Sequence, residues 1–256
     1  MAFCQVQFFS KSLVVASTVN VILPEESMGI GITASEQKEL PQVLYLLHGY
    51  SDDHSIWMRR TSVERYAAKH NLAVIMPAVN HSFYVNEKHG EKYWDYVSQE
   101  LPEIMHRFFR LSDRPEDTFV AGLSMGGYGA MRLALTYPER FAAAASFSGA
   151  VDIAQRYADR DKENRQFFPL FGDAETLEGT EYDLFHLLKK HAGDAHKPKL
   201  YVSCGTKDFL YGAHQRFCPA VQEAGWDLTT EEIPDAVHEW GLWDKQIEKF
   251  IEGYVR

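Results

Sequence analysis

The sequence is poor in cysteine, in basic residues and in long apolar runs. Its three cysteines are odd in number and widely spaced in 256 residues, which argues against a disulfide framework: Cys4, Cys204 and Cys218. No apolar run approaches the ~20 residues that a membrane-spanning helix needs. Acidic residues outnumber basic ones 36 to 26, and the resulting net charge of -10 argues against general nucleic-acid binding.

Signals for export and for a second domain are also missing. The first twelve residues, MAFCQVQFFSKS, lack a basic stretch followed by an apolar block and a cleavage site. Together with unpaired thiols, this predicts a cytoplasmic protein. No repeat and no Pro/Gly/Ser-rich linker divides the chain, so we expect a single domain over residues 1–256. The sequence is compatible with a monomer or a homo-oligomer.

The apolar patterning favours an α/β fold. Alternating residues near the start (Cys4, Val6 and Phe8) and an extended pattern over residues 13–23 predict an antiparallel hairpin. Six later apolar runs are mostly continuous, as in strands buried on both faces of a parallel sheet: 43–47, 72–76, 118–123, 141–147, 200–203 and 228–233. Helical patterns lie between or after them: 62–70, 93–109, 127–137, 213–224 and 242–254.

This alternation predicts a mostly parallel, doubly wound sheet with helices on both faces. Residues 152–197 contain no clear strand, and we expect a cap-like helical insertion over one end of the sheet. Pro102 should kink or restart the helix expected over 93–109. Residues 24–41, which include Gly29 and Gly31, are expected to form a loop.

The strongest local motif is Gly122-Leu123-Ser124-Met125-Gly126, which fits G-x-S-x-G. An apolar strand leads into Ser124 and a helix rich in small residues follows, the context that a nucleophilic serine of this type requires. Ser124 would occupy a strained turn, and a β-carbon at either flanking glycine would collide with the neighbouring strand or helix. The alternative is a glycine-rich turn that only lets a helix pack closely.

A serine nucleophile needs a base and an orienting acid, which in such folds follow in the order serine, acid, histidine. Of the five later histidines, His238 lies in the loop after the strand at 228–233, where the base belongs. The loop after the strand at 200–203 supplies Asp208, our choice for the acid. Asp235 is the weaker candidate for the acid. The alternative role for Asp208 is structural, as an aspartate in a turn or a helix cap.

Two backbone amides are candidates for the oxyanion hole. One is the N–H of Met125, directly after the nucleophile. The other is the N–H of Tyr50, in the loop His48-Gly49-Tyr50 that follows an early core strand. His48 itself is expected to be structural. Trp57 either lines the acyl pocket or packs in the core, and the sequence leaves both roles open.

These residues carry a family resemblance. The stretches 47–57, 122–130 and 147–149, together with Asp208 and His238, resemble the α/β-hydrolase esterases of the esterase D group, and are most similar to bacterial tributyrin esterases. The resemblance implies the α/β-hydrolase fold and hydrolysis of short-chain acyl esters, small molecules, with no metal or organic cofactor. It also implies the same triad of Ser124, Asp208 and His238.

Other functions stay open at this point. S-formylglutathione hydrolases share the Ser-Met-Gly-Gly core but usually carry a Gly-Leu-Thr-Cys-like first oxyanion loop, where this chain has Gly49-Tyr50-Ser51-Asp52. Feruloyl and acetylxylan esterases belong to the same superfamily, and an enzyme that deacetylates small sugar esters is another candidate. An acyltransferase with the same acyl-enzyme and a non-catalytic binding protein on a hydrolase scaffold complete the alternatives.

Overall fold

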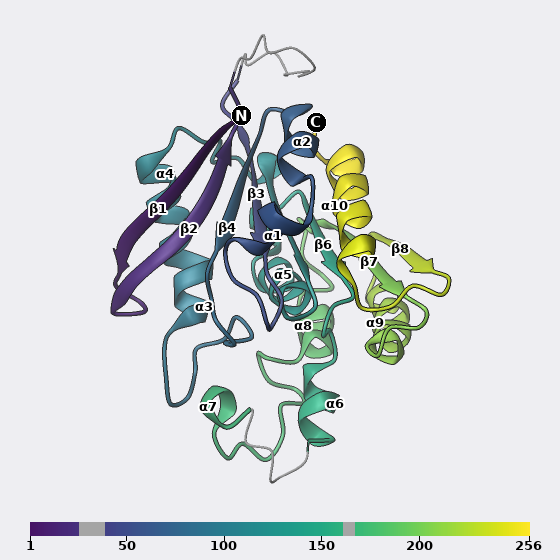
Figure 1. Cartoon of the computed structure of the whole chain (residues 1–256). Helices are drawn as coiled ribbons and strands as arrows, with labels where there is room; N and C mark the ends of the chain where they lie inside the picture. Colours follow the sequence, from purple (N-terminus) through teal and green to yellow (C-terminus); the bar gives the residue numbers. More distant parts are fainter. Residues whose placement is uncertain (26–38, 161–166) are drawn as a thin grey trace.

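A computed structural model describes residues 1–25, 39–160 and 167–256, and one eight-stranded sheet runs through it (Figure 1). The strand order is β1-β2-β4-β3-β5-β6-β7-β8. The first two strands, β1 (Ala2–Ser10) and β2 (Val15–Leu23), form an antiparallel hairpin, and β2 pairs antiparallel with β4. All other pairs are parallel and join β3 (Gln42–Leu47), β4 (Leu72–Pro77), β5 (Thr118–Leu123), β6 (Ala143–Phe147), β7 (Lys199–Gly205) and β8 (Leu228–Ile233). The predicted mostly parallel sheet with an N-terminal hairpin is therefore confirmed.

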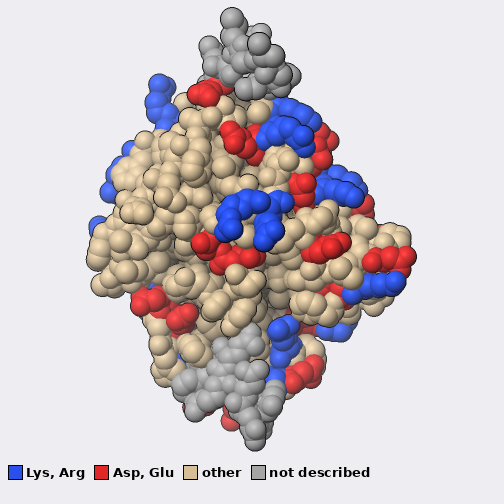
Figure 2. All heavy atoms as spheres, viewed as in Figure 1, with Lys and Arg blue, Asp and Glu red and all other residues tan. Residues whose placement is uncertain are grey.

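The hydrophobic pattern explains which strands lie inside. Every residue of β3 and β4 is buried, as their continuous apolar runs predict for strands covered on both faces. In the edge strand β1, Cys4, Val6 and Phe8 are half-buried while Gln5 and Gln7 are exposed. Neither hairpin strand contains a charged residue, and in Figure 2 most of the charged side chains lie in the middle and on the right of the view.

Helices cover both faces of the sheet, as predicted. One core cluster packs α1 (Ile56–Arg60), α2 (Val63–Ala68) and α10 (Trp240–Tyr254) against the sheet. The other face carries α4 (Leu101–Phe108), α5 (Met125–Thr136), α8 (Leu184–Lys190) and α9 (Tyr211–Glu223). No helix in the described parts of the chain is both long and apolar enough to cross a bilayer.

The segment expected as one kinked helix runs without a break from Tyr93 to Phe108, but its helical type changes twice. A short turn, α3 (Tyr93–Asp95), leads into a π-helical turn over Tyr96–Glu100, and α4 then begins at Leu101. Pro102 lies in the first turn of α4, and the carbonyl of Ser98, four residues before it, accepts a hydrogen bond from the Arg140 side chain at 2.7 Å. The helix therefore does not restart at Pro102, and the irregularity next to the proline is the π-helical turn that ends at Glu100.

The described part of the region 152–197 consists of short helices joined by turns and irregular segments. It contains α6 (Ile153–Ala158), α7 (Phe168–Phe171) and α8, and no strand occurs among its described residues. In Figure 1, α6 and α7 lie beyond the carboxyl ends of the central strands. The loop expected over residues 24–41 falls largely outside the described residues, with Gly29 and Gly31.

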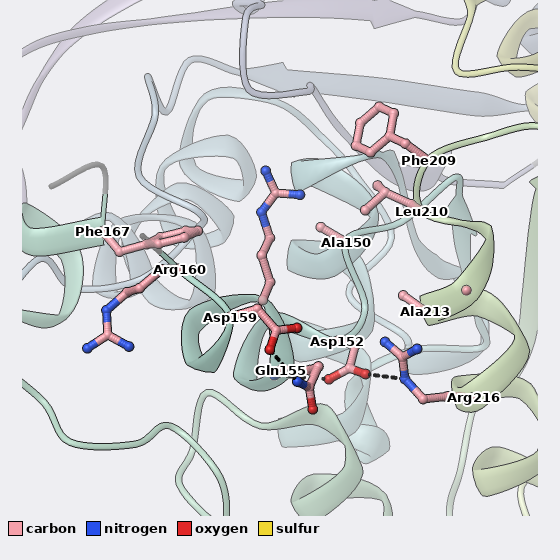
Figure 3. Close-up of a pocket in the computed structure, with 12 residues that line it drawn as sticks. Ala150, Asp152, Gln155, Asp159, Arg160, Phe167, Phe209, Leu210, Ala213 and Arg216 are labelled. Carbon is pink, nitrogen blue, oxygen red and sulfur yellow. Dashed lines mark hydrogen bonds and ion pairs between the residues drawn. The ribbon is translucent and has the colours of Figure 1, made fainter. Parts of the chain in front are cut away.

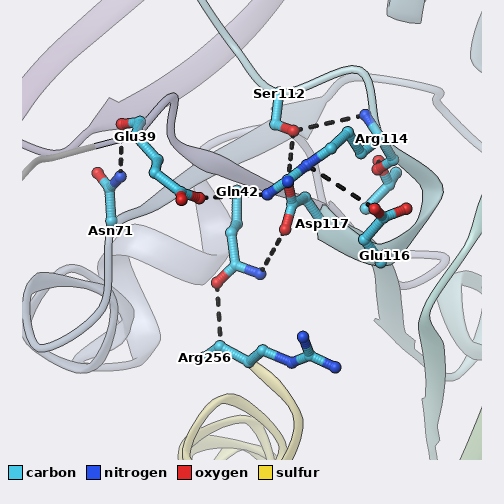
Figure 4. Close-up of polar contacts among 9 residues, drawn as sticks. Glu39, Gln42, Asn71, Ser112, Arg114, Glu116, Asp117 and Arg256 are labelled. Atoms are coloured by element: carbon cyan, nitrogen blue, oxygen red, sulfur yellow. Dashed lines mark hydrogen bonds and ion pairs between the residues drawn. The ribbon is translucent and has the colours of Figure 1, made fainter.

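A polar network ties the amino ends of the strands together at the opposite end of the sheet (Figure 4). The buried carboxylate of Asp117 accepts hydrogen bonds from Gln42 (3.2 Å), Ser112 (2.5 Å) and Arg114 (2.7 Å). Burial raises the pKa of Asp117, but these donors outweigh burial and lower it overall. The backbone N–H of Arg256 also donates to Gln42 at 3.1 Å, which anchors the C-terminus to β3.

Candidate active site

Ser124 occupies a strained turn between β5 and α5. Its backbone angles are φ 51° and ψ −116°, in a region that residues with a side chain rarely adopt. Hydrogen bonds on both sides fix the turn, because Ser124 N–H donates to Phe147 O at 2.9 Å and Ala150 N–H donates to Ser124 O at 3.0 Å. The serine is thereby held at the carboxyl end of a central strand.

The two glycines that flank the serine in the motif are required because other backbone segments lie very close to them. A β-carbon on Gly122 would lie 2.3 Å from the carbonyl oxygen of Gly126. A β-carbon on Gly126 would lie 2.3 Å from the carbonyl oxygen of Leu47, at the end of β3. Both distances are well inside van der Waals contact, so the collision expected from the motif is present in the structure.

Asp208 and His238 are joined by a hydrogen bond. The ring Nδ1–H of His238 donates to Oδ2 of Asp208 at 2.8 Å, because a carboxylate can only accept. Asp208 follows β7 and its side chain is fully buried, whereas His238 follows β8 and remains 19% exposed. This bond leaves Nε2 of His238 as the ring nitrogen available to a substrate or to the serine.

The carboxylate of Asp208 is held in its charged form. Burial raises the pKa of Asp208, but hydrogen bonding to His238, to the backbone N–H of Leu210 and to the Ser148 hydroxyl outweighs burial and lowers it overall. The Leu210 amide donates to Oδ1 at 2.8 Å, so both carboxylate oxygens are engaged. An ionised carboxylate behind the imidazole favours the cation that forms when His238 takes up a proton.

Aromatic rings fix the orientation of the His238 imidazole. The ring of Phe209 lies 4.6 Å from it between centroids, and Trp243 approaches it edge-on at 4.8 Å. Trp243 is itself anchored, since its indole N–H donates to the Ser148 hydroxyl at 3.1 Å. The imidazole is thus constrained by one hydrogen bond and by two aromatic neighbours.

Ser124 and His238 line the same cavity, which has a volume of about 520 Å³. Its walls come from the loops after β3, β4, β5, β6, β7 and β8 and from the helices α6 and α10. The remaining lining residues are Gly49, Tyr50, Ser51, Asp52, Phe83, Leu123, Met125, Ala150, Arg156, Phe209, Leu210, Glu239, Trp240 and Trp243. This size suits a small organic ligand.

The amides of Tyr50 and Met125 are free to bind an anion. Among the described residues, no hydrogen bond acceptor is paired with either N–H. Both residues line the cavity, and a β-carbon on the adjacent Gly49 would lie only 3.7 Å from the Ser124 Cβ. The two candidate oxyanion donors therefore border the serine from two sides.

His48 holds the loop that carries Gly49. Its Nδ1–H donates to Gly49 O at 2.7 Å, and its Nε2 accepts the Val79 N–H at 3.0 Å. The Tyr84 hydroxyl also donates to the carbonyl of His48 at 2.9 Å. Burial lowers the pKa of His48 to about 4, so the ring is neutral and has a structural role, as expected.

Trp57 is a packing residue, which corrects its assignment as a substrate-binding candidate. Its side chain is buried, its indole N–H donates to Leu47 O at 3.0 Å, and it is absent from the cavity lining. Its ring packs edge-on against Trp240, which does line the cavity, at 5.3 Å. Asp235, the rival acid, is exposed and pairs with Lys207 at 2.7 Å, away from His238.

Several residues that line the active-site cavity belong to no sequence motif and were not identified in the sequence analysis. Phe209, Leu210, Glu239 and Trp240 adjoin Asp208 or His238 in the chain, so proximity in sequence could have pointed to them. Phe83 lies in an irregular segment at φ 48°, where no sequence pattern indicates that its ring faces the cavity.

The parallel sheet, its two helical layers and the strained serine turn after β5 define the α/β-hydrolase class of proteins. Comparisons with known proteins go further. Residues 10–251 match the family Esterase, described as "Putative esterase". The acetyl esterase of Caldicellulosiruptor saccharolyticus is 32% identical over 263 aligned residues, which cover 98% of this chain and 97% of that protein.

Two solved structures from Staphylococcus aureus are similar over the whole chain. The substrate-bound fluorophosphonate-binding serine hydrolase FphF is 36% identical with a TM-score of 0.88, covering 100% of this chain and 98% of its own. The S-formylglutathione hydrolase FrmB, as apoenzyme, is also 36% identical, with a TM-score of 0.85 and coverage of 100% and 99%. The chain belongs to this esterase family and is a serine hydrolase of carboxylic esters.

Proposed function

We propose that the chain is a short-chain acyl esterase of the esterase D group, similar to bacterial tributyrin esterases. The observation that carries this proposal is the cavity in which Ser124 and the Asp208-bonded His238 meet. Its volume of about 520 Å³ and its aromatic walls suit a small ester better than a polymer chain.

The proposed mechanism follows from the orientation of His238. Nε2 of His238 takes the proton of Ser124 as the serine oxygen attacks the ester carbonyl, while Asp208 holds the imidazole in the required tautomer. The amides of Tyr50 and Met125 stabilise the oxyanion of the tetrahedral intermediate. His238 then protonates the leaving alcohol, and water releases the acyl group from Ser124 by the same steps in reverse.

We further propose a single catalytic domain in which residues 152–197 act as a cap. The family match over residues 10–251 supports one domain, and the presence of Arg156 in the cavity wall supports a cap that contributes to the site. The three cysteines are free in the structure, which supports our proposal of a cytoplasmic enzyme.

Two related activities are second candidates because specific relatives support them. The 36% identity to an S-formylglutathione hydrolase supports a thioesterase, and the 32% identity to an acetyl esterase supports removal of acetyl groups, the reaction of an acetyl esterase acting on acetylated sugars. All three activities use the same acyl-enzyme chemistry and differ in the acyl group that Ser124 accepts and in the group that leaves.

The deciding experiment measures hydrolysis of p-nitrophenyl esters from acetate to dodecanoate by wild type and Ser124→Ala. We expect rates that peak at short chains, that disappear in the variant and that survive treatment with EDTA. A preference for dodecanoate would overturn the short-chain assignment. Turnover of S-formylglutathione without a Ser124-dependent oxoester rate would replace it by the thioesterase.

A further inference from the structure

A second cavity of about 410 Å³ adjoins the active site (Figure 3). Ala150, Arg156, Phe209 and Leu210 line both cavities, so the two spaces share one wall. The second cavity is otherwise built from α6 and the start of α9. A group bound in the active-site cavity therefore lies next to the second cavity.

Most charged groups of the second cavity are already paired. Figure 3 shows Asp152 turned toward Arg216, an ion pair of 2.8 Å, and Gln155 turned toward Asp159, a hydrogen bond of 2.8 Å. Arg160 donates to the backbone carbonyl oxygens of Tyr157 and Ala174. These contacts occupy two carboxylates and two guanidinium groups.

Arg156 is the exception. In residues 1–25, 39–160 and 167–256 its guanidinium has no hydrogen bond, ion pair or ring contact, although it lines both cavities. Three arginines and two aspartates line the second cavity, which makes it net positive in a protein whose total charge is -10. An unpaired guanidinium in such a place matches the planar geometry of a carboxylate.

The second cavity lies on the leaving-group side of the active site. His238 protonates the departing oxygen in the proposed mechanism, so the leaving group must lie beside its ring. Phe209, 4.6 Å from that ring and 69% exposed, forms part of the wall between the two cavities. The oxyanion loop contributes no residue to the lining of the second cavity.

We infer that the second cavity is a subsite for a leaving group that carries a carboxylate, and that Arg156 binds this carboxylate. This inference rests on the proposed esterase function and narrows its substrate class. Preferred substrates are then short-chain acyl esters of small hydroxy acids.

A matched pair of esters tests this inference. 4-Acetoxybenzoate and 4-acetoxybenzamide share the acyl group, the bond that breaks and the shape of the leaving group, and differ in the charge at its far end. The quantity measured is the ratio of kcat/KM for the charged ester to that for the neutral ester. This ratio cancels changes in folding or chemistry that affect both substrates equally.

We expect Arg156→Gln to lower the ratio about tenfold, mainly through KM of the charged ester, because a charge-assisted contact is lost. The ratio for Arg156→Lys should lie between those of wild type and Arg156→Gln, since lysine keeps the charge but not the planar guanidinium group. Arg107→Gln is the control: it removes the same charge from the exposed face of α4, outside both cavities, and should leave the ratio unchanged.

An unchanged ratio in Arg156→Gln would overturn the inference, as would an equal fall in Arg107→Gln, which would indicate only the overall field of the protein. Absence of Ser124-dependent hydrolysis of the neutral ester would instead overturn the proposed function. The two failures are therefore distinguishable in one set of measurements.

Discussion

The indole N–H of Trp243 donates to the hydroxyl of Ser148 at 3.1 Å, and the same indole packs edge-on against His238. Ser148 is fully buried in the loop after β6, and its hydroxyl also lowers the pKa of Asp208. One serine thus contacts Trp243 beside His238 and stabilises the charged form of Asp208 without lining the cavity.

Ser148→Ala should reduce kcat about tenfold with little change in KM, because a hydrogen bond to a charged group is lost. Removing this donor also raises the pKa of Asp208, so the acid side of the pH–rate profile should move to higher pH. Steady-state kinetics from acid to neutral pH measure both effects.

Ser98→Ala is the matched control for Ser148→Ala. Its hydroxyl is equally buried but, within the part of the chain that the structure describes, has no hydrogen-bond partner. We expect no change in the pH profile of this variant. A similar shift in both variants would mean that Ser148 acts only through core packing.

Asp208→Asn should lower kcat by roughly 10³–10⁴-fold, because an amide cannot hold the imidazole in the productive tautomer. Asp235→Asn should have no measurable effect, since that exposed carboxylate pairs only with Lys207. Rates on a p-nitrophenyl ester decide between the two aspartates. The reverse pattern would make Asp235 the catalytic acid.

Gly126→Ala should destabilise the fold by several kcal/mol, because its β-carbon would lie 2.3 Å from a carbonyl oxygen of β3. Gly253→Ala offers the contrast in α10, where nothing lies within 4 Å of the new β-carbon. That change should stabilise the protein by about 0.5–1 kcal/mol. Thermal melts compare the two, and a Gly126→Ala protein as stable as wild type would refute the steric argument.

His48 should make stability depend on pH. Burial lowers its pKa to about 4 in the folded protein, against about 6.5 in the unfolded chain, so between these values the unfolded chain binds more protons. Stability is therefore lost as the pH falls through this window, by about 3 kcal/mol in total.

Urea unfolding of wild type and His48→Gln from pH 4 to 7 isolates this contribution, since the other histidines titrate in both proteins. The stability advantage of wild type should shrink as the pH falls. A constant difference between the two proteins would show that His48 does not carry the effect.

The sequence was sufficient to predict those parts of the fold and of the site that depend on residues close together in the chain or on the order of the strands. The continuous apolar runs identify the strands, and the strand–Ser124–helix order determines where the serine lies. The loop positions of Asp208 and His238 follow because the carboxyl ends of parallel strands meet at one edge of a sheet. These features depend on a few neighbouring residues or on chain order alone.

The cavity walls depend on tertiary contacts and could not be predicted in the same way. Whether Trp57 or Trp240 faces the cavity is decided by the carbonyl of Leu47, which binds the Trp57 indole N–H in the core. Arg156 comes from the region 152–197, whose short helices carry no recognisable motif. Its relation to Ser124 arises only when this region lies over the carboxyl ends of the strands.

The position of β8 at the edge of the sheet affects how activity can be lost without unfolding of the whole protein. β8 is an edge strand that pairs only with β7, and most of its side chains are at least partly exposed. The loop after it carries His238, whereas Ser124 follows a strand that is flanked on both sides. Local opening of this edge would separate His238 from Ser124 while the central strands stay paired, which the proposed mechanism does not tolerate. The protein would then spend part of its time as an inactive but largely folded molecule, which faster amide hydrogen exchange in β8 than in β5 would reveal.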